Sequence, residues 1–162
     1  MEQQRLRDLV AGCPLAILYS PIGDEVDPVS IREFSGVLPT ERIIIPPSKE
    51  TDPIELAQEI REKYTDHRAC VFVPGRMFDA RGTRTGRGGG WYDRFLAALP
   101  EDWIWIGVTS AAHYSNEPLA RQVWDQPMDW VVVHENDTDV VFETNARKKK
   151  TDYEESGEKG VS

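Results

Sequence analysis

This chain has little of what several protein classes require. It contains only two cysteines among 162 residues, Cys13 and Cys70, and their spacing fits neither a metal site nor a redox motif. No apolar run approaches the length that spans a bilayer. Residues 1–14 are polar at first and then interrupted by glycine and proline, unlike a signal peptide. These features predict buried, reduced thiols and a cytoplasmic location.

Positive charge is also scarce. The chain has 19 Lys and Arg against 28 Asp and Glu, a formal net charge of −9 and a pI near 4.8. A general nucleic-acid binder needs a basic surface, so that class is excluded. Hydrophobic residues make up 40% and charged residues 29% of the chain, as in a globular domain with a proper core. We expect a monomer whose partners are small molecules, with no nucleic acid and no membrane.

Apolar segments alternate with helical patterns. The expected strands are residues 15–20, 42–46, 69–73, 103–109 and 130–134, with residues 140–143 as a short edge strand. The expected helices are residues 28–34, 53–64, 91–99 and 117–123, the second opened by Asp52-Pro53. This alternation predicts one α/β domain over residues 1–145, a three-layer α/β/α fold with a mostly parallel sheet. Residues 146–162 have almost nothing apolar and predict a disordered polar tail.

One stretch concentrates glycine and arginine. Between Arg81 and Arg94, five of fourteen residues are glycine and four are arginine. Glycine lets backbone N–H groups approach an anion closely, and arginine offers phosphate a charged, forked donor. The stretch follows an expected strand, so it should lie at the carboxyl edge of the sheet, before a helix N-terminus that favours anions. With Asp93 behind it, we interpret it as a cradle for a nucleotide phosphate with Mg²⁺.

Two commoner nucleotide loops are excluded. No lysine follows the glycines, as a P-loop would require. A dinucleotide-binding fingerprint starting at Gly86 would need its third glycine where Trp91 stands. The competing interpretation of the stretch is a solvated surface turn that carries arginines.

The stretch resembles the signature of the 5-formyltetrahydrofolate cyclo-ligases, also called methenyltetrahydrofolate synthetases. The pattern runs Val73-Pro74-Gly75, Phe78-Asp79, Gly82-x-Arg84-x-Gly86-x-Gly88-x-Gly90 and Tyr92-Asp93. Shorter likenesses flank it, at Tyr19-x-Pro21 with Glu25-Val26-Asp27 and at Trp124-Asp125 with Met128-Asp129-Trp130. The likeness covers about residues 15–135, and the chain looks like a shortened or divergent member.

The resemblance implies ATP-dependent closure of 5-formyltetrahydrofolate to 5,10-methenyltetrahydrofolate, with release of ADP and phosphate. In the family the formyl oxygen is phosphorylated first, and the neighbouring amine then closes the ring and expels phosphate. ATP and Mg²⁺ are the implied cofactors, and a reduced folate is the implied substrate. Such a site must hold the reacting groups in line and neutralise charge.

The resemblance also implies roles for single residues. The nucleotide loop would comprise Arg84, Gly86, Arg87, Gly88, Gly89, Gly90, Trp91 and Tyr92. Arg84 and Arg87 would be the catalytic cations that clamp phosphate oxygens, and Arg87 would also contact the substrate. Trp91 would stack on a pterin or adenine ring, or else pack into the core as an aromatic at a helix start.

Four acidic residues matter to the same likeness. Asp93 and Asp125 match the family's metal ligands, although Asp93 could instead be a first-turn helix aspartate. Asp129 is an alternative ligand, but we interpret it as a structural acid before the last strand. Glu25 matches a substrate-binding glutamate that accepts hydrogen bonds from the pterin ring; the competing interpretation is an isolated loop acid.

The start of the chain departs from the family. Members usually begin with a longer helical segment, in which a Lys and an Arg contact ATP; here residues 1–12 precede the first strand, and Arg5 and Arg7 could stand in. Two other functions stay open. One is a non-catalytic cyclo-ligase-like domain that binds a nucleotide or folate as a regulatory or interaction module. The other is an ATP-dependent enzyme with a different substrate.

Overall fold

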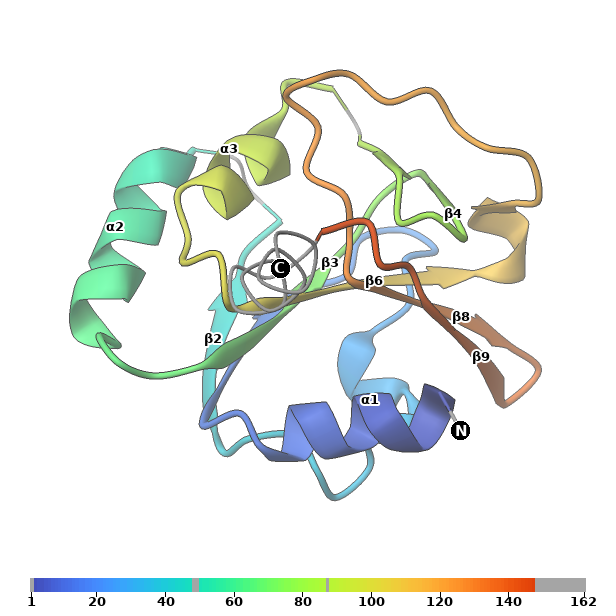
Figure 1. The fold of residues 1–162 in the computed structure, drawn as a ribbon, viewed down its shortest axis with the longest axis horizontal. Helices are drawn as coiled ribbons and strands as arrows, with labels where there is room; N and C mark the ends of the chain where they lie inside the picture. Colours follow the sequence, from blue (N-terminus) through green and yellow to red (C-terminus); the bar gives the residue numbers. More distant parts are fainter. Residues whose placement is uncertain (1, 48–49, 87, 148–162) are drawn as a thin grey trace, which may run out of the picture.

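A six-stranded sheet forms the centre of the molecule, with helices on both faces (Figure 1). The computed structural model describes residues 2–47, 50–86 and 88–147. The strand order is β2-β1-β3-β6-β8-β9, in which only the edge strand β9 is antiparallel to its neighbour. The strands are β1 Leu15–Tyr19, β2 Glu41–Ile45, β3 Ala69–Val73, β6 Ile104–Ser110, β8 Trp130–Glu135 and β9 Thr138–Glu143. The expected three-layer fold is confirmed.

The two faces of the sheet are covered by different helices. Helices α2 (Pro53–Lys63) and α3 (Trp91–Ala97) pack on one face, and helix α1 (Glu2–Ala11) lies on the other (Figure 1). Asp52 caps α2, since its carboxylate accepts hydrogen bonds from the N–H groups of Ile54 and Glu55. Helix α1 was not expected from the sequence, and it buries Leu6 and Val10 against the sheet.

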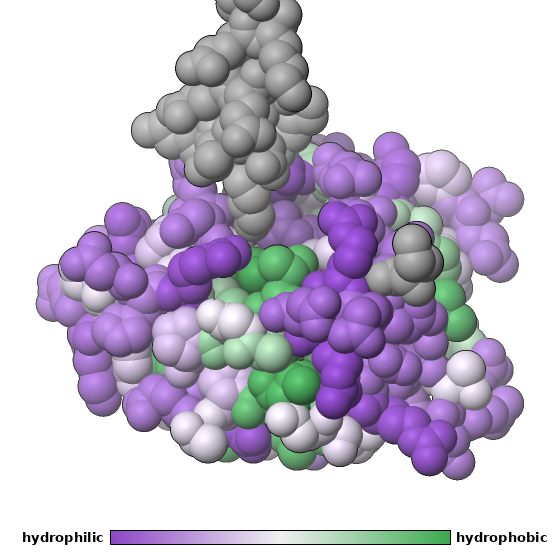
Figure 2. Space-filling model, turned by 60° about the horizontal axis from the view of Figure 1, so that its bottom comes forward, coloured by the Kyte–Doolittle hydropathy of each residue, from purple (hydrophilic) through white to green (hydrophobic). Residues whose placement is uncertain are grey.

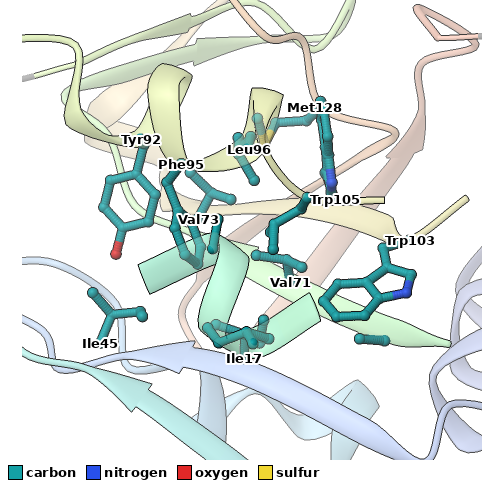
Figure 3. Packing of buried hydrophobic residues seen from close by; sticks show 14 of the residues in the cluster. Ile17, Ile45, Val71, Val73, Tyr92, Phe95, Leu96, Trp103, Trp105 and Met128 are labelled. Carbon is teal, nitrogen blue, oxygen red and sulfur yellow. The ribbon is translucent and has the colours of Figure 1, made fainter. Parts of the chain in front are cut away.

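Successive strand residues serve the two cores in turn, because side chains of a strand alternate between its faces. In β3, Val71 and Val73 face α2 and α3, whereas Cys70 and Phe72 face α1. Figure 3 shows Phe95 and Leu96 of α3 packed over Val71 and Val73. Both faces are therefore buried, which explains why β1 and β3 are continuously apolar in sequence.

Two of the expected helices are wrong. Residues 28–34 form two 3₁₀ turns, Pro28–Ser30 and Arg32–Phe34, because Ile31 between them is extended with φ −69° and ψ 122°. Residues 117–123 are a loop. Its polar groups bond to the neighbouring hairpin instead of to one another, as Leu119 N–H donates to Asp79 and Arg121 donates to Thr83.

A second small sheet, which includes residues at the start of the glycine and arginine stretch, was not anticipated. Its order is β5-β4-β7, and its strands are β4 Met77–Asp79, β5 Arg84–Thr85 and β7 Tyr114–Ser115. Strands β4 and β5 form an antiparallel hairpin, with Phe78 opposite Arg84. The stretch is thus folded around a hairpin instead of being one continuous loop.

The surface agrees with the acidic, polar composition. The face shown in Figure 2 is largely hydrophilic, and its hydrophobic side chains gather mainly near the centre, with a smaller group at the right-hand edge. Both cysteines are buried. Within the described ranges, no helix has the length and apolarity needed to cross a bilayer.

The expected polar tail, residues 146–162, falls outside the described residues from position 148 onward. Its second residue, Arg147, is fixed to the domain. The Arg147 guanidinium pairs with Asp129 at 2.7 Å and lies 3.3 Å from the centroid of the Trp105 ring. The described chain therefore includes two residues past position 145.

Candidate functional site

A pocket of about 250 Å³ opens at the carboxyl ends of the parallel strands. The chain runs from β1 to β2 on one side and then returns to place β3 on the other side of β1. Ligands of open α/β sheets bind at such a reversal of strand order. The residues that leave these three strands line the pocket: Tyr19, Ser20, Ile45, Pro46, Pro47, Pro74 and Gly75. The expectation that the glycine and arginine stretch would lie at this edge agrees with the geometry.

Asp79 organises the hairpin that carries Arg84 to the pocket. Its buried carboxylate accepts hydrogen bonds from the N–H groups of Arg81 at 3.0 Å and Thr83 at 2.9 Å, which closes the β4–β5 turn. The other oxygen accepts the N–H of Leu119 at 2.8 Å. The family signature thus contains an acid with a structural task, and the sequence alone assigned it none.

Arg84 is buried at the pocket wall. Its side chain is 6% exposed, and Nη1 donates to the carbonyl of Pro74 at 3.1 Å. Nη2 lies 3.9 Å from Asp93, and the guanidinium carbon lies 5.6 Å from the Tyr92 ring centroid. The Nε–H has no hydrogen-bond partner among the described residues. A buried donor without a partner is costly, so the burial of Arg84 here is not explained by stability alone.

Gly75 makes room for this arginine. A Cβ atom at Gly75 would lie 2.7 Å from Cγ of Arg84, and one at Gly86 would lie 3.1 Å from Nη1. Both distances are shorter than ordinary contacts. Glycine at these two positions therefore lets the backbone close around the Arg84 side chain.

The electrostatics of the pocket centre on the same group. Burial lowers the pKa of the Arg84 guanidinium, while nearby Asp93, Tyr92 and Asp125 oppose that shift. Burial also raises the pKa of the Tyr92 hydroxyl, despite the opposing effect of Arg84. The pKa of Tyr19 is raised by burial and by the negative charge of Glu25. Among its described residues, the pocket therefore presents the buried Arg84 cation together with two neutral phenols at physiological pH.

The glycines that follow adopt backbone conformations that other residues rarely reach. Gly88, Gly89 and Gly90 have φ values of 95°, 77° and 65°, and Gly86, Gly88 and Gly90 line the pocket. The loop is held at its end by Arg94, which donates to the carbonyl of Gly89. Arg87 lies outside the described residues, so its expected roles as catalytic cation and substrate contact stay predictions.

The two expected metal ligands lie near one another. The Asp93 carboxylate accepts the N–H of Gln126 at 3.0 Å, which brings the segment containing Asp125 beside α3. Asp125 accepts the N–H of Gln122 at 2.7 Å and, unlike Asp93, does not line the pocket. Among the described residues, no cluster of three or more His, Cys, Asp or Glu side chains could hold a metal ion. Two carboxylates nevertheless suit Mg²⁺ when phosphate oxygens complete its shell.

Glu25 and Trp91, the expected substrate contacts, both line the pocket. Glu25 also accepts the N–H of Ile22 at 3.0 Å, which stabilises its loop. Trp91 is buried. Its ring stacks on Phe95 with centroids 5.2 Å apart, and its Nε1–H donates to the carbonyl of Thr51 at 2.9 Å. Of the two alternatives for Trp91, packing in the core has direct structural support.

Three expectations about other charged residues can be compared with the structure. Arg5 pairs with Glu143, and Arg7 donates to the carbonyl of Glu33 at 2.9 Å. Neither lines the pocket, so they do not stand in for the family's ATP-contacting basic residues there. Asp129 accepts the N–H of Trp105 at 2.8 Å, which agrees with the structural role assigned to it.

Several pocket residues were given no role from the sequence, although Trp124 stands in the Trp124-Asp125 likeness. Ile22, Ile45 and Trp124 line the pocket through apolar surface. Ile45 ends β2, and a strand end in an α/β sheet is a signal that could have indicated it. Ile22 and Trp124 lie on loops, where no periodic pattern marks them.

Comparisons with known proteins support the family resemblance and the fold. A family model described as the 5-formyltetrahydrofolate cyclo-ligase family matches residues 49–134, more than half of the chain. A 5,10-methenyltetrahydrofolate synthetase from Mycoplasma pneumoniae has a similar structure, with a TM-score of 0.52, 21% identity, and 81% of this chain and 80% of that chain covered. The NMR structure of the 5,10-methenyltetrahydrofolate synthetase from Aquifex aeolicus is also similar, with a TM-score of 0.52 and 24% sequence identity. The match covers 91% of this chain and 85% of that chain. At these identities the structural likeness supports the fold. No curated protein sequence matches.

Proposed function

Because this chain belongs to the 5-formyltetrahydrofolate cyclo-ligase family, we propose that it catalyses the ATP- and Mg²⁺-dependent closure of 5-formyltetrahydrofolate to 5,10-methenyltetrahydrofolate. Family membership makes it an enzyme of the ligase kind in folate metabolism. In the proposed reaction the γ-phosphoryl group passes to the formyl oxygen. The neighbouring amine then attacks the activated carbon, the ring closes, and phosphate leaves beside ADP.

The observation that carries the proposal is the buried Arg84 guanidinium in the pocket wall. Its Nε–H lacks a partner among the described residues, and its charge is shielded from water. A fixed donor in a water-poor site stabilises developing negative charge at little reorganisation cost. We assign Arg84 to the phosphate oxygens during transfer. Gly86, Gly88 and Gly90 would offer backbone N–H groups to the same phosphates.

Asp93 and Asp125 are the residues that would hold Mg²⁺. In each residue, one carboxylate oxygen accepts a hydrogen bond from a backbone N–H. The other oxygen makes no hydrogen bond within the described ranges. The ion would neutralise phosphate charge during transfer. The protein holds both carboxylates near Arg84, where burial lowers the pKa of the guanidinium and their negative charges oppose that shift.

The decisive assay is single-turnover formation of the methenyl product, followed by its absorbance, with enzyme and ATP in excess over 5-formyltetrahydrofolate. The expected result is one product per substrate, dependent on ATP and Mg²⁺. Absence of product at high enzyme concentration, in a preparation that still binds ATP, would reject the catalytic proposal.

We expect Asp125→Asn to raise the Mg²⁺ concentration needed for half-maximal activity by about tenfold, with the fold retained. A neutral amide is a poorer ligand than a carboxylate for a hard cation. The measurement is a Mg²⁺ titration of product formation, with Asp93→Asn in parallel. Asp102→Asn, at an exposed loop acid outside the pocket, is the control. Unchanged titrations in both test variants would remove the metal role.

Glu25→Gln should raise the KM for 5-formyltetrahydrofolate by about tenfold and leave that for ATP near the wild-type value. The amide keeps the size of the side chain, but it loses the charge that strengthens hydrogen bonds from the pterin ring. Steady-state kinetics with each substrate varied in turn gives the answer. Glu33→Gln, on the 3₁₀ turn Arg32–Phe34 and outside the pocket, serves as the control. An equal rise in both KM values would contradict the assignment to folate.

The second candidate is a non-catalytic cyclo-ligase-like domain that binds a nucleotide or a folate. The observation that favours it is the placement of Arg5 and Arg7, which bind Glu143 and Glu33 away from the pocket. This candidate predicts ATP or folate binding by calorimetry without methenyl product in the single-turnover assay.

A further inference from the structure

The five tryptophans of this chain differ sharply in exposure. Four are buried, with no more than 6% of their surface exposed: Trp91, Trp103, Trp105 and Trp130. Trp124 is 63% exposed, yet it lines the same pocket as Arg84 and Asp93. An indole is a large apolar group, and its exposure at the mouth of a polar pocket points to a ligand that covers it.

The backbone around Trp124 is fixed although its ring is open. Asp125 accepts the N–H of Gln122 at 2.7 Å, which closes a turn around Trp124. The next residue after Asp125, Gln126, donates its N–H to Asp93 of α3 at 3.0 Å, and this bond holds the turn against that helix. The indole is therefore carried by an anchored segment, so a ligand that contacts it would not have to order the backbone first.

Apolar surface continues around the pocket mouth. Ile22 is 37% exposed and also lines the pocket, on the loop that carries Glu25. The polar groups of the pocket, Arg84 and Asp93, lie in the same cavity. A ligand that fits both kinds of surface has an anionic part and a flat apolar part. Both proposed substrates have this character, through the adenine ring of ATP or the pterin ring of the folate.

Trp91, for which the sequence left stacking on a ligand and packing in the core both open, is engaged in the core. Its ring stacks on Phe95 at an interplanar angle of 25°, and its Nε1–H donates a hydrogen bond to the carbonyl of Thr51. With 6% of its surface exposed, it offers the pocket a small area. Trp124 has the open ring surface that stacking on a heterocycle requires.

We propose that Trp124 is the aromatic platform on which a flat heteroaromatic ring of the substrate stacks, either the adenine of ATP or the pterin of the folate. The identity of these ligands rests on the proposed function. Stacking adds affinity without selecting one hydrogen-bonding pattern, because every such ring has a π-face. Trp124 would thus supply binding for the ring, whereas Arg84 and the glycines would supply binding for phosphate.

Calorimetry separates ring binding from phosphate binding. The probes are ATP with Mg²⁺, inorganic tripolyphosphate with Mg²⁺, and 5-formyltetrahydrofolate. Trp124→Ala should weaken either ATP or the folate by about tenfold, as expected for loss of one stacked ring. Tripolyphosphate binding should not change, because it has no ring. Trp124→Phe should restore most of the lost affinity, and whichever ligand is affected identifies the ring.

The neighbouring Val123 provides a matched control. It is 96% exposed and does not line the pocket, so Val123→Ala should change none of the three affinities. If Trp124→Ala weakened tripolyphosphate as much as ATP, disturbance of the loop would explain the loss and the proposal would fail. The proposal would also fail if Trp124→Ala bound both ring ligands as tightly as the wild type.

Fluorescence provides a test that does not depend on turnover. Acrylamide should quench mainly the exposed Trp124 in the wild type, and this quenching should be absent in Trp124→Phe. The ligand that stacks should protect Trp124 from acrylamide. Protection without methenyl product would reject cyclisation and support the platform. If the methenyl product forms but acrylamide still quenches Trp124 when both ligands are bound, cyclisation is supported and the platform is rejected.

Discussion

Replacing Arg84 by Met should lower the rate of methenyl-product formation by at least about 100-fold, the usual loss when one transition-state donor is removed. The methionine keeps an unbranched stem beside Gly75 but removes the guanidinium. ATP binding should weaken by about 1.5–3 kcal/mol, the range for a charge-assisted hydrogen bond. The rate is followed by single-turnover absorbance and the affinity by calorimetry.

The stability of the same variant should not fall. Arg84 is a buried cation whose Nε–H has no partner among the described residues, and relief of the cost of burying that charge offsets the loss of its hydrogen bond to Pro74 and of its pairing with the partly exposed Asp93. Urea unfolding should therefore give a free energy equal to or above that of the wild type. Loss of activity together with retained stability is the pattern expected of a residue kept for function.

Arg81→Met is the matched control for this experiment. Arg81 belongs to the same stretch, but its side chain is 55% exposed and donates to the carbonyl of Leu119, outside the pocket. Its loss should leave product formation within about threefold of the wild type, since exposed interactions contribute little. If Arg84→Met kept a similar activity, Arg84 would have no part in phosphoryl transfer.

Gly82→Ala should lower the free energy of unfolding by about 3–5 kcal/mol, a large part of the stability of an ordinary domain. Gly82 has a φ of 84°, which side chains disfavour. The added Cβ would also lie 2.4 Å from the carbonyl oxygen of Met128. That clash is hard to relieve, because Met128 N–H donates to the carbonyl of Gly82 at 2.8 Å. Urea or thermal unfolding gives the measurement.

Gly36→Ala separates the two causes. Gly36 has a similar φ of 78°, but nothing lies within 4 Å of an added Cβ. The expected loss is about 1–2 kcal/mol, from the backbone conformation alone. Equal losses in the two variants would show that the contact with Met128 relaxes easily and that the steric part of the prediction is wrong.

The strands of the central sheet were the most predictable part of the fold. Residues 69–73 were expected as a strand and form β3 with the same limits. The reason is that the central parallel strands are buried on both faces, so their sequences are apolar without interruption. The carboxyl-edge location of the glycine and arginine stretch followed from the same alternation of strands and helices, and the family resemblance is confirmed by the family match.

Segments stabilised by distant partners were not predictable. Residues 117–123 have a helical pattern but form a loop, because Asp79 and Thr83 bind Leu119 and Arg121 from about forty positions earlier in the chain. The same reason applies to β7, which pairs with β4 across a long separation. Local sequence patterns do not contain such contacts, and tertiary hydrogen bonds can outweigh local propensity.

The sequence by itself determined the class of this protein: an acidic α/β domain whose glycines and arginines lie at one edge of a mostly parallel sheet. Composition and spacing suffice for this, because strand burial and glycine conformations are local properties. Only the tertiary structure decided which side chains serve that edge. In the folded protein Arg84 and Trp91 are buried, and Arg5 pairs with Glu143. Trp124 stays exposed where it lines the pocket. Burial and exposure of single side chains depend on packing between distant segments, which no short pattern encodes.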